Sequence, residues 1–369
     1  MVKKKEVGLS SKTALYMMMF LIVINVVLAG LSVAKSRGMF IPGQPEPIIK
    51  EGVIDLDDLT LEQKIGQMTV VIGIRYYAEA LKNMQIGGVH LHAMEEDETF
   101  KERVDFFQSG TIIPFFVTVD LEGCVNPFVN FREFPAVSEV SKLGEAFEKG
   151  KTEGKFLREL GITVDFAPVV DLEDNIWNCR SFPGTKEEIT ELANAYILGM
   201  QDEGILATAK HYPGKTLVIK DPHQFLAAAE ITEDDLYPYQ ELVRKGNVQA
   251  IMVSHIITYG EVNSEGKPSV TSKKIMDQLR NEFGFDGLII SDEINMQGVK
   301  KFYDSLNEMY IDVFKAGSDM VLNFNQDPNE IHNMITTVAQ AVEEGEIDED
   351  RIDASVRRIL EAKGFVVED

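Results

Sequence analysis

The stretch Ile205-Leu206-Ala207-Thr208-Ala209-Lys210-His211-Tyr212-Pro213-Gly214 decides the fold of this chain. Its first half is a short run of apolar and small residues, typical of a buried strand, and its second half begins with a lysine and a histidine. Leu288-Ile289-Ile290-Ser291 followed by Asp292 repeats the arrangement later in the chain. Polar residues at the C-terminal ends of apolar strands are the arrangement with which α/β barrels carry out chemistry.

Similar apolar runs, rich in β-branched residues, recur along the sequence with helical patterns between most of them. They are Met68–Ile72, Gly88–Leu91, Phe115–Val119, Val164–Val170, Ile205–Ala209, Ala250–Ser254, Leu288–Ser291 and Met320–Asn323. The helical patterns include Glu187–Asp202 and Ser272–Glu282. Repeated βα units with continuous apolar strands predict a parallel sheet, and this number of units predicts a (β/α)₈ barrel of the TIM type. A doubly wound open sheet is the alternative, weakened because no glycine-rich phosphate loop follows the first run.

The ends of this region carry helix signals. Thr60 with Gln63 fits a capping box at the start of the first amphipathic helix. The last helix places Ile352, Val356 and Ile359 on one stripe, and Gly364 suits its end. We therefore expect one barrel domain over residues 55–369 and no second domain after it.

The N-terminus predicts a membrane segment. Lys3, Lys4, Lys5 and Lys12 precede an uncharged, mostly apolar run from Thr13 to Ala34, which as a helix would span about 33 Å. The lysines should stay in the cytoplasm, which places the rest of the chain outside it. Residues 1–34 are expected to be a signal-anchor, or a signal peptide cleaved after Ser32-Val33-Ala34; a buried core helix is disfavoured. Residues 35–54 contain several Gly and Pro residues and suit a flexible linker.

Composition limits the partners and cofactors. The 369 residues carry a formal charge of −24, which argues against nucleic acid or an anionic lipid surface as the main partner. The only two cysteines, Cys124 and Cys179, exclude a disulfide framework and a thiolate metal site. We expect two buried free thiols, with a bridge between them as the alternative in an oxidising compartment. No cofactor is expected, and the oligomeric state stays open.

Charged residues and histidines follow most of the predicted strands, and a barrel would gather them at one end. They are His92, Asp120, Glu122, Asp171, Lys210, His211, His255, Asp292 and Glu293. Any one alone could be a capping or salt-bridged residue. His90 and His92 lie on the same side of a strand and could chelate a metal, but no third ligand at matching spacing is evident, so no metal site is expected.

The segment after Gly214 contains Asp221-Pro222-His223. A histidine oriented by a nearby carboxylate is an effective general acid and base near neutral pH. The competing interpretation is a simple turn, which Asp-Pro sequences favour.

Several motifs together resemble glycoside hydrolase family 3, and within it the bacterial single-domain β-N-acetylhexosaminidases. The similarity runs from about Leu59 to Lys363. It rests on the segments 61–68, 86–89, Asp120-Leu121-Glu122-Gly123, 165–171, Arg180-Ser181-Phe182, Lys210-His211-Tyr212-Pro213-Gly214, and Ser291-Asp292 with Met296.

The resemblance implies a retaining hydrolysis of β-linked N-acetylglucosamine, for example from cell-wall fragments, with Asp292 as nucleophile. The hexosaminidase branch uses an Asp-x-His dyad after the fifth strand, which Asp221 and His223 match. Asp120, Arg180, Lys210 and His211 would hold sugar hydroxyls. A glycoside phosphorylase, a catalytically weakened glycan-binding protein and a Schiff-base aldolase using Lys210 are the alternatives.

Two segments depart from the family pattern. The branch reads Gly-His-Gly-Asp-Thr after the proline, whereas Gly214 is followed here by Lys215-Thr216-Leu217-Val218. The turn after Glu122 reads Gly123-Cys124-Val125 in place of Gly-Gly-Arg. An Arg and a His that would touch substrate are therefore missing, which implies altered specificity or weak activity.

Overall fold

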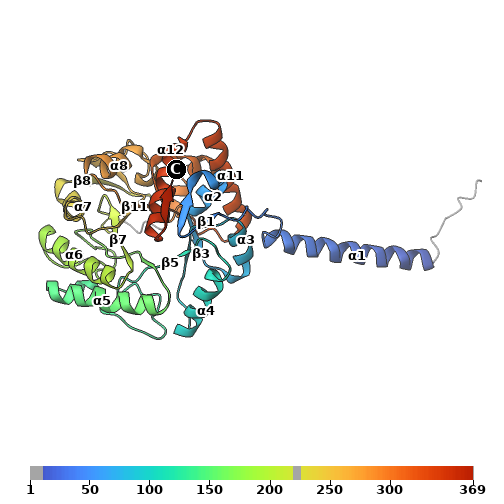
Figure 1. Cartoon of the computed structure of the whole chain (residues 1–369), viewed down its shortest axis with the longest axis horizontal. Helices are drawn as coiled ribbons and strands as arrows, with labels where there is room; N and C mark the ends of the chain where they lie inside the picture. The colour runs from blue at the N-terminus through green and yellow to red at the C-terminus, as the bar shows by residue number, and fades with distance from the viewer. Residues whose placement is uncertain (1–10, 219–225, 369) are drawn as a thin grey trace, which may run out of the picture.

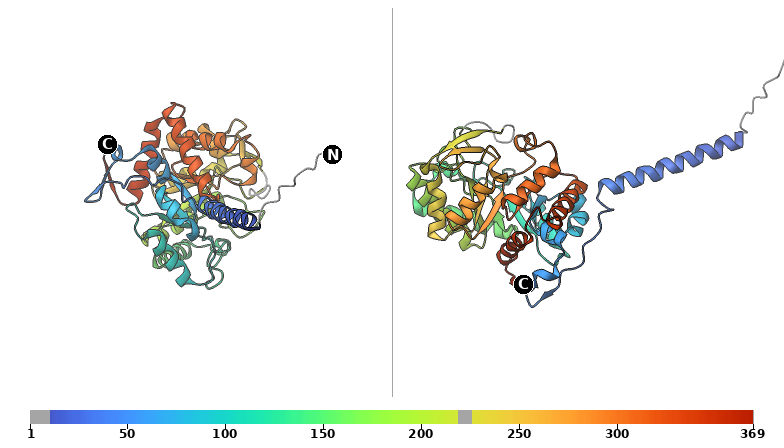
Figure 2. Two further views of the ribbon diagram at one scale, coloured as in Figure 1. Left: turned by 90° about the vertical axis from the view of Figure 1, so that its right-hand side faces the viewer. Right: turned by 90° about the horizontal axis from the view of Figure 1, so that it is seen from above.

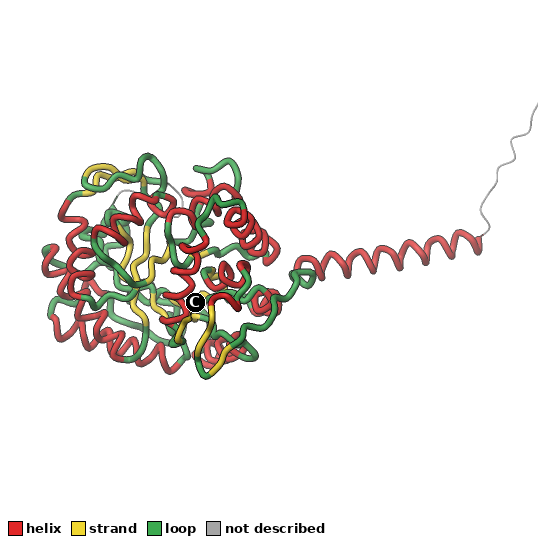
Figure 3. Tube along the Cα trace, turned by 45° about the horizontal axis from the view of Figure 1, so that its top comes forward, coloured by secondary structure: helices red, strands yellow, loops and turns green. Residues whose placement is uncertain are grey.

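The computed structural model describes residues 11–218 and 226–368, and its core is a nearly closed barrel of eight parallel strands. Figure 3 shows these strands inside a ring of helices. In chain order the strands are β3 (Thr69–Ile72), β4 (Gly88–His90), β5 (Phe116–Val119), β6 (Val164–Asp165), β7 (Leu206–Tyr212), β9 (Ala250–Val253), β11 (Leu288–Ser291) and β12 (Val321–Leu322). Each pairs with the next, β12 pairs with β3, and an isolated bridge between Ile290 and Met320 links β11 to the start of β12. The predicted (β/α)₈ barrel is confirmed, and the open-sheet alternative is wrong.

Amphipathic helices cover the outside of the barrel (Figure 1). They are α2 (Leu61–Gln67), α3 (Ala78–Asn83), α4 (Asp97–Gln108), α5 (Leu143–Glu159), α6 (Lys186–Asp202), α7 (Glu233–Lys245), α8 (Lys273–Asp277) with the π-turn η5 (Gln278–Glu282), α10 (Leu306–Ala316), α11 (Pro328–Glu343) and α12 (Glu349–Ala362). The predicted capping box of Thr60 and Gln63 is present. Helices α5 and α6 can approach closely because residue 150 is a glycine. A Cβ at Gly150 would lie 2.1 Å from the Tyr196 carbonyl oxygen and would force the helices apart.

Shorter elements complete the described chain. They are the 3₁₀ turns η1 (Leu56–Asp58), η2 (Arg75–Tyr77), η3 (Val137–Glu139) and η4 (Ser269–Thr271), the short helix α9 (Gln297–Lys300), and the parallel pair β8 (Ala228–Ile231) and β10 (Ile257–Gly260).

Two predicted strands differ from the observed ones by more than one residue at an end. The run 164–170 forms only the two-residue β6, because Pro168 has no backbone N–H to donate to a neighbour. The run 205–209 extends to Tyr212 in β7, because the Lys210 and Tyr212 backbone pairs with β9. Lys210 and His211 are therefore part of the strand, and all of its residues are buried.

The predicted flexible linker over residues 35–54 is wrong for most of its length. The side-chain amides of Gln63 and Gln85 both donate to the Pro45 carbonyl oxygen at 2.7 Å. Ile41 and Ile54 are buried in the core. Strands β1 (Ile49–Lys50), β2 (Val53–Asp55) and β13 (Val366–Glu368) form a small sheet. The segment with these prolines and glycines runs along the barrel. Side-chain donors of the barrel bind the Pro45 carbonyl group, which in a free tether would bind water.

Helix α1 (Ser11–Ser36) projects away from the barrel (Figures 1 and 2). Its part Leu15–Ser36 is long and apolar enough to cross a membrane, and none of that part is buried. The helix end is held on the barrel, because Asn329 at the start of α11 donates to the Lys35 carbonyl at 2.9 Å. Arg37 stacks on the Tyr76 ring, 4.2 Å from its centre. Gly38 (φ +69°) must be glycine there, since a Cβ would lie 2.9 Å from that of Ala80.

Candidate active site

A cavity of about 370 Å³ opens at the C-terminal ends of the barrel strands. It gathers the predicted site residues Asp120, Arg180, Lys210, His211 and Asp292 around one space. The remaining lining residues are His90, His92, Glu122, Val125, Phe166, Trp177, Met252, Glu293, Met296, Leu322 and Phe324. Parallel strands point their C-terminal ends to one face, so residues from four distant parts of the sequence meet there.

The most buried part of the site is a cluster of two cations and two carboxylates. The Lys210 ammonium lies 2.5 Å from Asp120 and 2.6 Å from Glu122. Arg180 reaches the same Glu122 with two nitrogens, Nη2 at 2.8 Å and Nε in a second short hydrogen bond. Glu122 and Lys210 are each only 2% exposed. Each charge therefore has an opposite charge beside it, as buried charges require.

The cluster favours the charged forms of Lys210 and Asp120. Burial would lower the pKa of Lys210, but Asp120 and Glu122 outweigh it and raise that pKa. Burial would raise the pKa of Asp120, but the charges of Lys210 and Arg180 lower it below its ordinary value. A Schiff-base lysine must lose its proton to attack a carbonyl, so a Lys210 this firmly protonated argues against the aldolase alternative.

Asp292 lies directly after β11 on a turn that its neighbours hold. Its backbone N–H donates to the Val253 carbonyl at 2.9 Å, and its Oδ1 accepts from the Glu293 N–H at 2.8 Å. The Glu293 carboxylate accepts the backbone N–H groups of Asn295 and Phe324, and burial above all raises its pKa. His255 donates from Nε2 to the Glu293 carbonyl. Hydrogen bonds from His255, Asn295 and Phe324 to Glu293 thus hold the turn. Asp292 itself is only 8% exposed.

Asp171 supports the strand end that carries Lys210 and His211. Its carboxylate accepts the backbone N–H of His211 at 3.1 Å and that of Thr216 at 3.0 Å. Burial raises its pKa from 3.8 to about 6, although these two hydrogen bonds lower it in part. Leu217 is fully buried, so the segment that departs from the family pattern is packed into the barrel.

His90 is a packed residue of the cavity wall beside His92. His90 Nδ1 lies 2.9 Å from the Thr118 hydroxyl, and burial lowers its pKa to about 4. Its ring stacks on Phe324 with centres 4.8 Å apart. Among the described residues, no three His, Cys, Asp or Glu side chains are arranged to hold a metal ion. His90 therefore acts as a neutral, packed wall of the cavity.

Aromatic walls are the part of the site that sequence reasoning missed. Phe166 and Phe324 flank His90, and Trp177 stacks on the Arg180 guanidinium at 4.7 Å. Trp177 is the only tryptophan in the chain and lies three residues before Arg180, a signal that could have identified it. Phe324 follows the last strand, where the sequence offers no motif.

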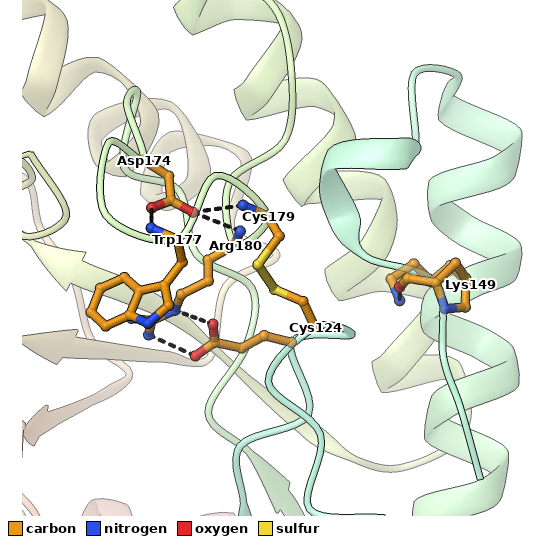
Figure 4. Close-up of a disulfide and its surroundings, with 8 residues drawn as sticks. Cys124, Lys149, Asp174, Trp177, Cys179 and Arg180 are labelled. Carbon is orange, nitrogen blue, oxygen red and sulfur yellow. Dashed lines mark hydrogen bonds and ion pairs between the residues drawn. A yellow bond between two sulfur atoms is a disulfide. The ribbon is translucent and has the colours of Figure 1, made fainter. Parts of the chain in front are cut away.

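Cys124 and Cys179 form a disulfide, so the expectation of buried free thiols is wrong (Figure 4). Cys124 lies in the loop after β5 and Cys179 in the loop after β6, and neighbouring strands bring these loops together with the Cα atoms 6.1 Å apart. Cys124 is exposed and Cys179 half-buried, which also differs from the prediction.

Asp221 and His223, the predicted acid and base dyad, lie outside the described residues. Their catalytic role stays a prediction. The described chain on either side ends at Val218 and resumes at Leu226.

Known proteins resemble the chain over the whole barrel. The family profile described as "Glycosyl hydrolase family 3 N terminal domain" matches residues 60–362. "Beta-hexosaminidase LpqI" of Mycobacterium tuberculosis is 28% identical over 331 residues, covering 83% of each chain. The "Beta-hexosaminidase" of Tolumonas auensis is 32% identical over 264 residues, 67% of this chain and 78% of the relative.

Solved structures agree with these relatives. "M tuberculosis LpqI" aligns with a TM-score of 0.76 and 27% identity over 84% of this chain and 95% of that one. A "glycoside hydrolase family 3 beta-N-acetylglucosaminidase" from Paenibacillus sp. aligns with a TM-score of 0.74 and 28% identity, covering 83% of this chain and 62% of that one. Because the family profile covers residues 60–362, which include every strand of the barrel, we conclude that this chain belongs to glycosyl hydrolase family 3 and is a glycosidase.

Proposed function

We propose that the protein is a retaining β-N-acetylhexosaminidase that removes β-linked N-acetylglucosamine residues. The single observation that carries this proposal is the position of Asp292, which lies buried at the end of β11 and lines the same cavity as the Lys210 cluster. The names of the related proteins, beta-hexosaminidase and beta-N-acetylglucosaminidase, support the choice of sugar.

The reaction proceeds in two steps. Asp292 attacks the anomeric carbon and forms a glycosyl-enzyme ester, while His223 gives a proton to the departing glycosidic oxygen. A water molecule then attacks the same carbon, His223 takes its proton, and the Asp292 carboxylate leaves. Asp221 orients the His223 imidazole and stabilises its charged form. Two displacements at one carbon retain the β configuration.

The charged cluster holds the sugar. Lys210 and Arg180 can donate to hydroxyl or acetamide oxygens, and Asp120 can accept from a hydroxyl, because its side chain is 34% exposed. His211 lines the same cavity. A volume of about 370 Å³ lies near the lower end of the range for ligand pockets, which fits a single terminal sugar residue.

The protein acts outside the cytoplasm, held at the membrane by α1 or released by cleavage of the segment. An apolar helix after a lysine cluster supports this topology, and a disulfide is typical of an oxidising compartment. The end of α1 rests on η2 and the start of α11, which follow β3 and β12 at the cavity end of the barrel. An anchored form would therefore act on glycans close to the membrane surface, such as peptidoglycan.

Assaying the purified protein on a panel of chromogenic β-glycosides tests the proposal. We expect the N-acetylglucosaminide to be the best substrate and the first product to be the β-anomer. A dominant β-glucosidase activity, or an α-anomer as first product, would contradict it. A sugar 1-phosphate formed only with added phosphate would indicate a phosphorylase, and binding of N-acetylglucosamine without turnover would indicate a glycan-binding protein.

A further inference from the structure

The loop after β6 carries Trp177 and Arg180 into the sugar cavity, and its stretch 172–179 contains no buried residue. Glu173, Asn175 and Asn178 are exposed, and no helix or strand forms between Asp165 and Lys186. Its main internal support is the Asp174 carboxylate. That group accepts the backbone N–H groups of Trp177, Cys179 and Arg180 at 2.8–2.9 Å (Figure 4).

A covalent bond and an ion pair tie this loop to the loop after β5. Cys179 directly precedes Arg180, and its partner Cys124 stands two residues after Glu122. Glu122 accepts two hydrogen bonds from Arg180. The ion pair does not hold the two loops alone during binding, because Glu122 is shared with Lys210 and the Arg180 donors also serve a bound sugar.

The bridge is a feature of this chain's departure from the family pattern. Cys124 occupies the turn Gly123-Cys124-Val125, for which the family resemblance predicts Gly-Gly-Arg. Val125 of the same turn and Trp177 both line the cavity. The bridge thus joins the two loops that supply Val125 and Trp177 to the cavity wall.

We propose that the Cys124–Cys179 disulfide is a positioning element of the sugar site, which holds Trp177 as a substrate-contacting wall and Arg180 as a donor. The Trp177 ring would pack on the apolar face of the bound sugar, while the Arg180 guanidinium, 4.7 Å from the ring centre, helps to fix its orientation. This inference rests on the proposed function only in that N-acetylglucosamine binds the cavity.

The test compares the full-length wild type with the double variant Cys124→Ser/Cys179→Ser. Because Cys124 is exposed and Cys179 half-buried, the substitution should leave the barrel folded. We expect KM for a chromogenic N-acetylglucosaminide to rise at least about fivefold, with a smaller change in kcat, since binding and not the nucleophile is disturbed. Trp177→Ala should raise KM to a similar extent, and Trp177→Phe, which keeps an aromatic face, should restore most of it.

A reductant provides an internal control. Excess dithiothreitol supplies two electrons and two protons to the bridge, yielding two thiols and oxidised dithiothreitol. It should raise KM of the wild type reversibly and leave the Ser/Ser variant unchanged. Since Trp177 is the only tryptophan, its emission should become more open to iodide quenching in both the reduced protein and the variant.

Unchanged KM after loss of the bridge, measured well below each protein's unfolding temperature, overturns the proposal. Equal losses in Trp177→Phe and Trp177→Ala overturn the stacking role. If the wild type shows no turnover, the same comparison is made with the Kd for N-acetylglucosamine from calorimetry. In that case the proposed hydrolysis fails while the positioning role is still tested.

Discussion

Replacing Glu122 with glutamine tests whether the buried charge cluster holds the site together. Glu122 lies 2.6 Å from the Lys210 ammonium and 2.8 Å from Arg180 Nη2, and it is 2% exposed. The substitution keeps the shape but removes one of two negative charges. Lys210 and Arg180 are then left with Asp120 as their only carboxylate within the cluster, an excess of one buried positive charge.

The expected loss of stability follows from these distances. Coulomb's law at 2.6 Å with an effective dielectric constant of about 20 gives about 6 kcal/mol for the Glu122–Lys210 pair, before the cost of burying the charges is subtracted. Breaking a buried pair by removing one partner typically costs about 3–5 kcal/mol. For a barrel of about 300 residues, with an unfolding entropy of roughly 0.6 kcal/mol/K, this lowers Tm by about 5–8 °C.

Thermal unfolding followed by circular dichroism measures this shift, and KM for the N-acetylglucosaminide should rise in the same variant because Arg180 and Lys210 lose their common acceptor. Glu145→Gln is the matched control. Glu145 lies 2.5 Å from Lys142 but on the surface, so water already screens the pair and Tm should not change measurably. A Glu122→Gln variant that melts within about 1 °C of the wild type would refute the reasoning that burial makes this cluster strong.

The remaining predictions concern the nucleophile, the acid and base dyad, the pH dependence and the topology. Asp292→Asn should lower turnover by several orders of magnitude, and retention of more than roughly a tenth of the wild-type rate would remove it as nucleophile. His223→Ala should lower kcat/KM for substrates with poor leaving groups far more than for activated phenyl glycosides. Asp221→Ala should show the same difference to a smaller extent. Equal losses of kcat/KM for both kinds of substrate would mean that the segment is only a turn. Because burial raises the pKa of Asp171 from 3.8 to about 6, the folded protein keeps a proton there that the unfolded chain has lost. The free energy of unfolding should therefore fall by roughly 3 kcal/mol as pH rises from about 4 to about 6, and urea titrations of Asp171→Asn should lack that part of the slope. Protease added to intact cells should reach residues 35–369, and protection until the membrane is opened would contradict the proposed topology.

The sequence alone determined the barrel and the residues at its strand ends. Apolar runs such as Leu288–Ser291 are local patterns, and in a parallel barrel every strand ends on the same face, so the meeting of Asp292 with Lys210 follows from the fold class. The capping box at Thr60 and the apolar helix α1 are also local, since neighbouring residues decide them. The family motifs added the expected role of Asp292, which no local pattern supplies.

Only the tertiary structure decided which side chains share partners. Cys124 and Cys179 are 55 residues apart, and their bridge exists because β5 and β6 are adjacent strands whose loops meet above the barrel. Glu122 serves Arg180 and Lys210 together for the same reason. Trp177 is a wall of the cavity, and Ile41 and Ile54 are buried, because of contacts with distant segments. Spacing along the chain does not predict such contacts, because they depend on which strands are neighbours in the folded barrel and on the course of the loops between them.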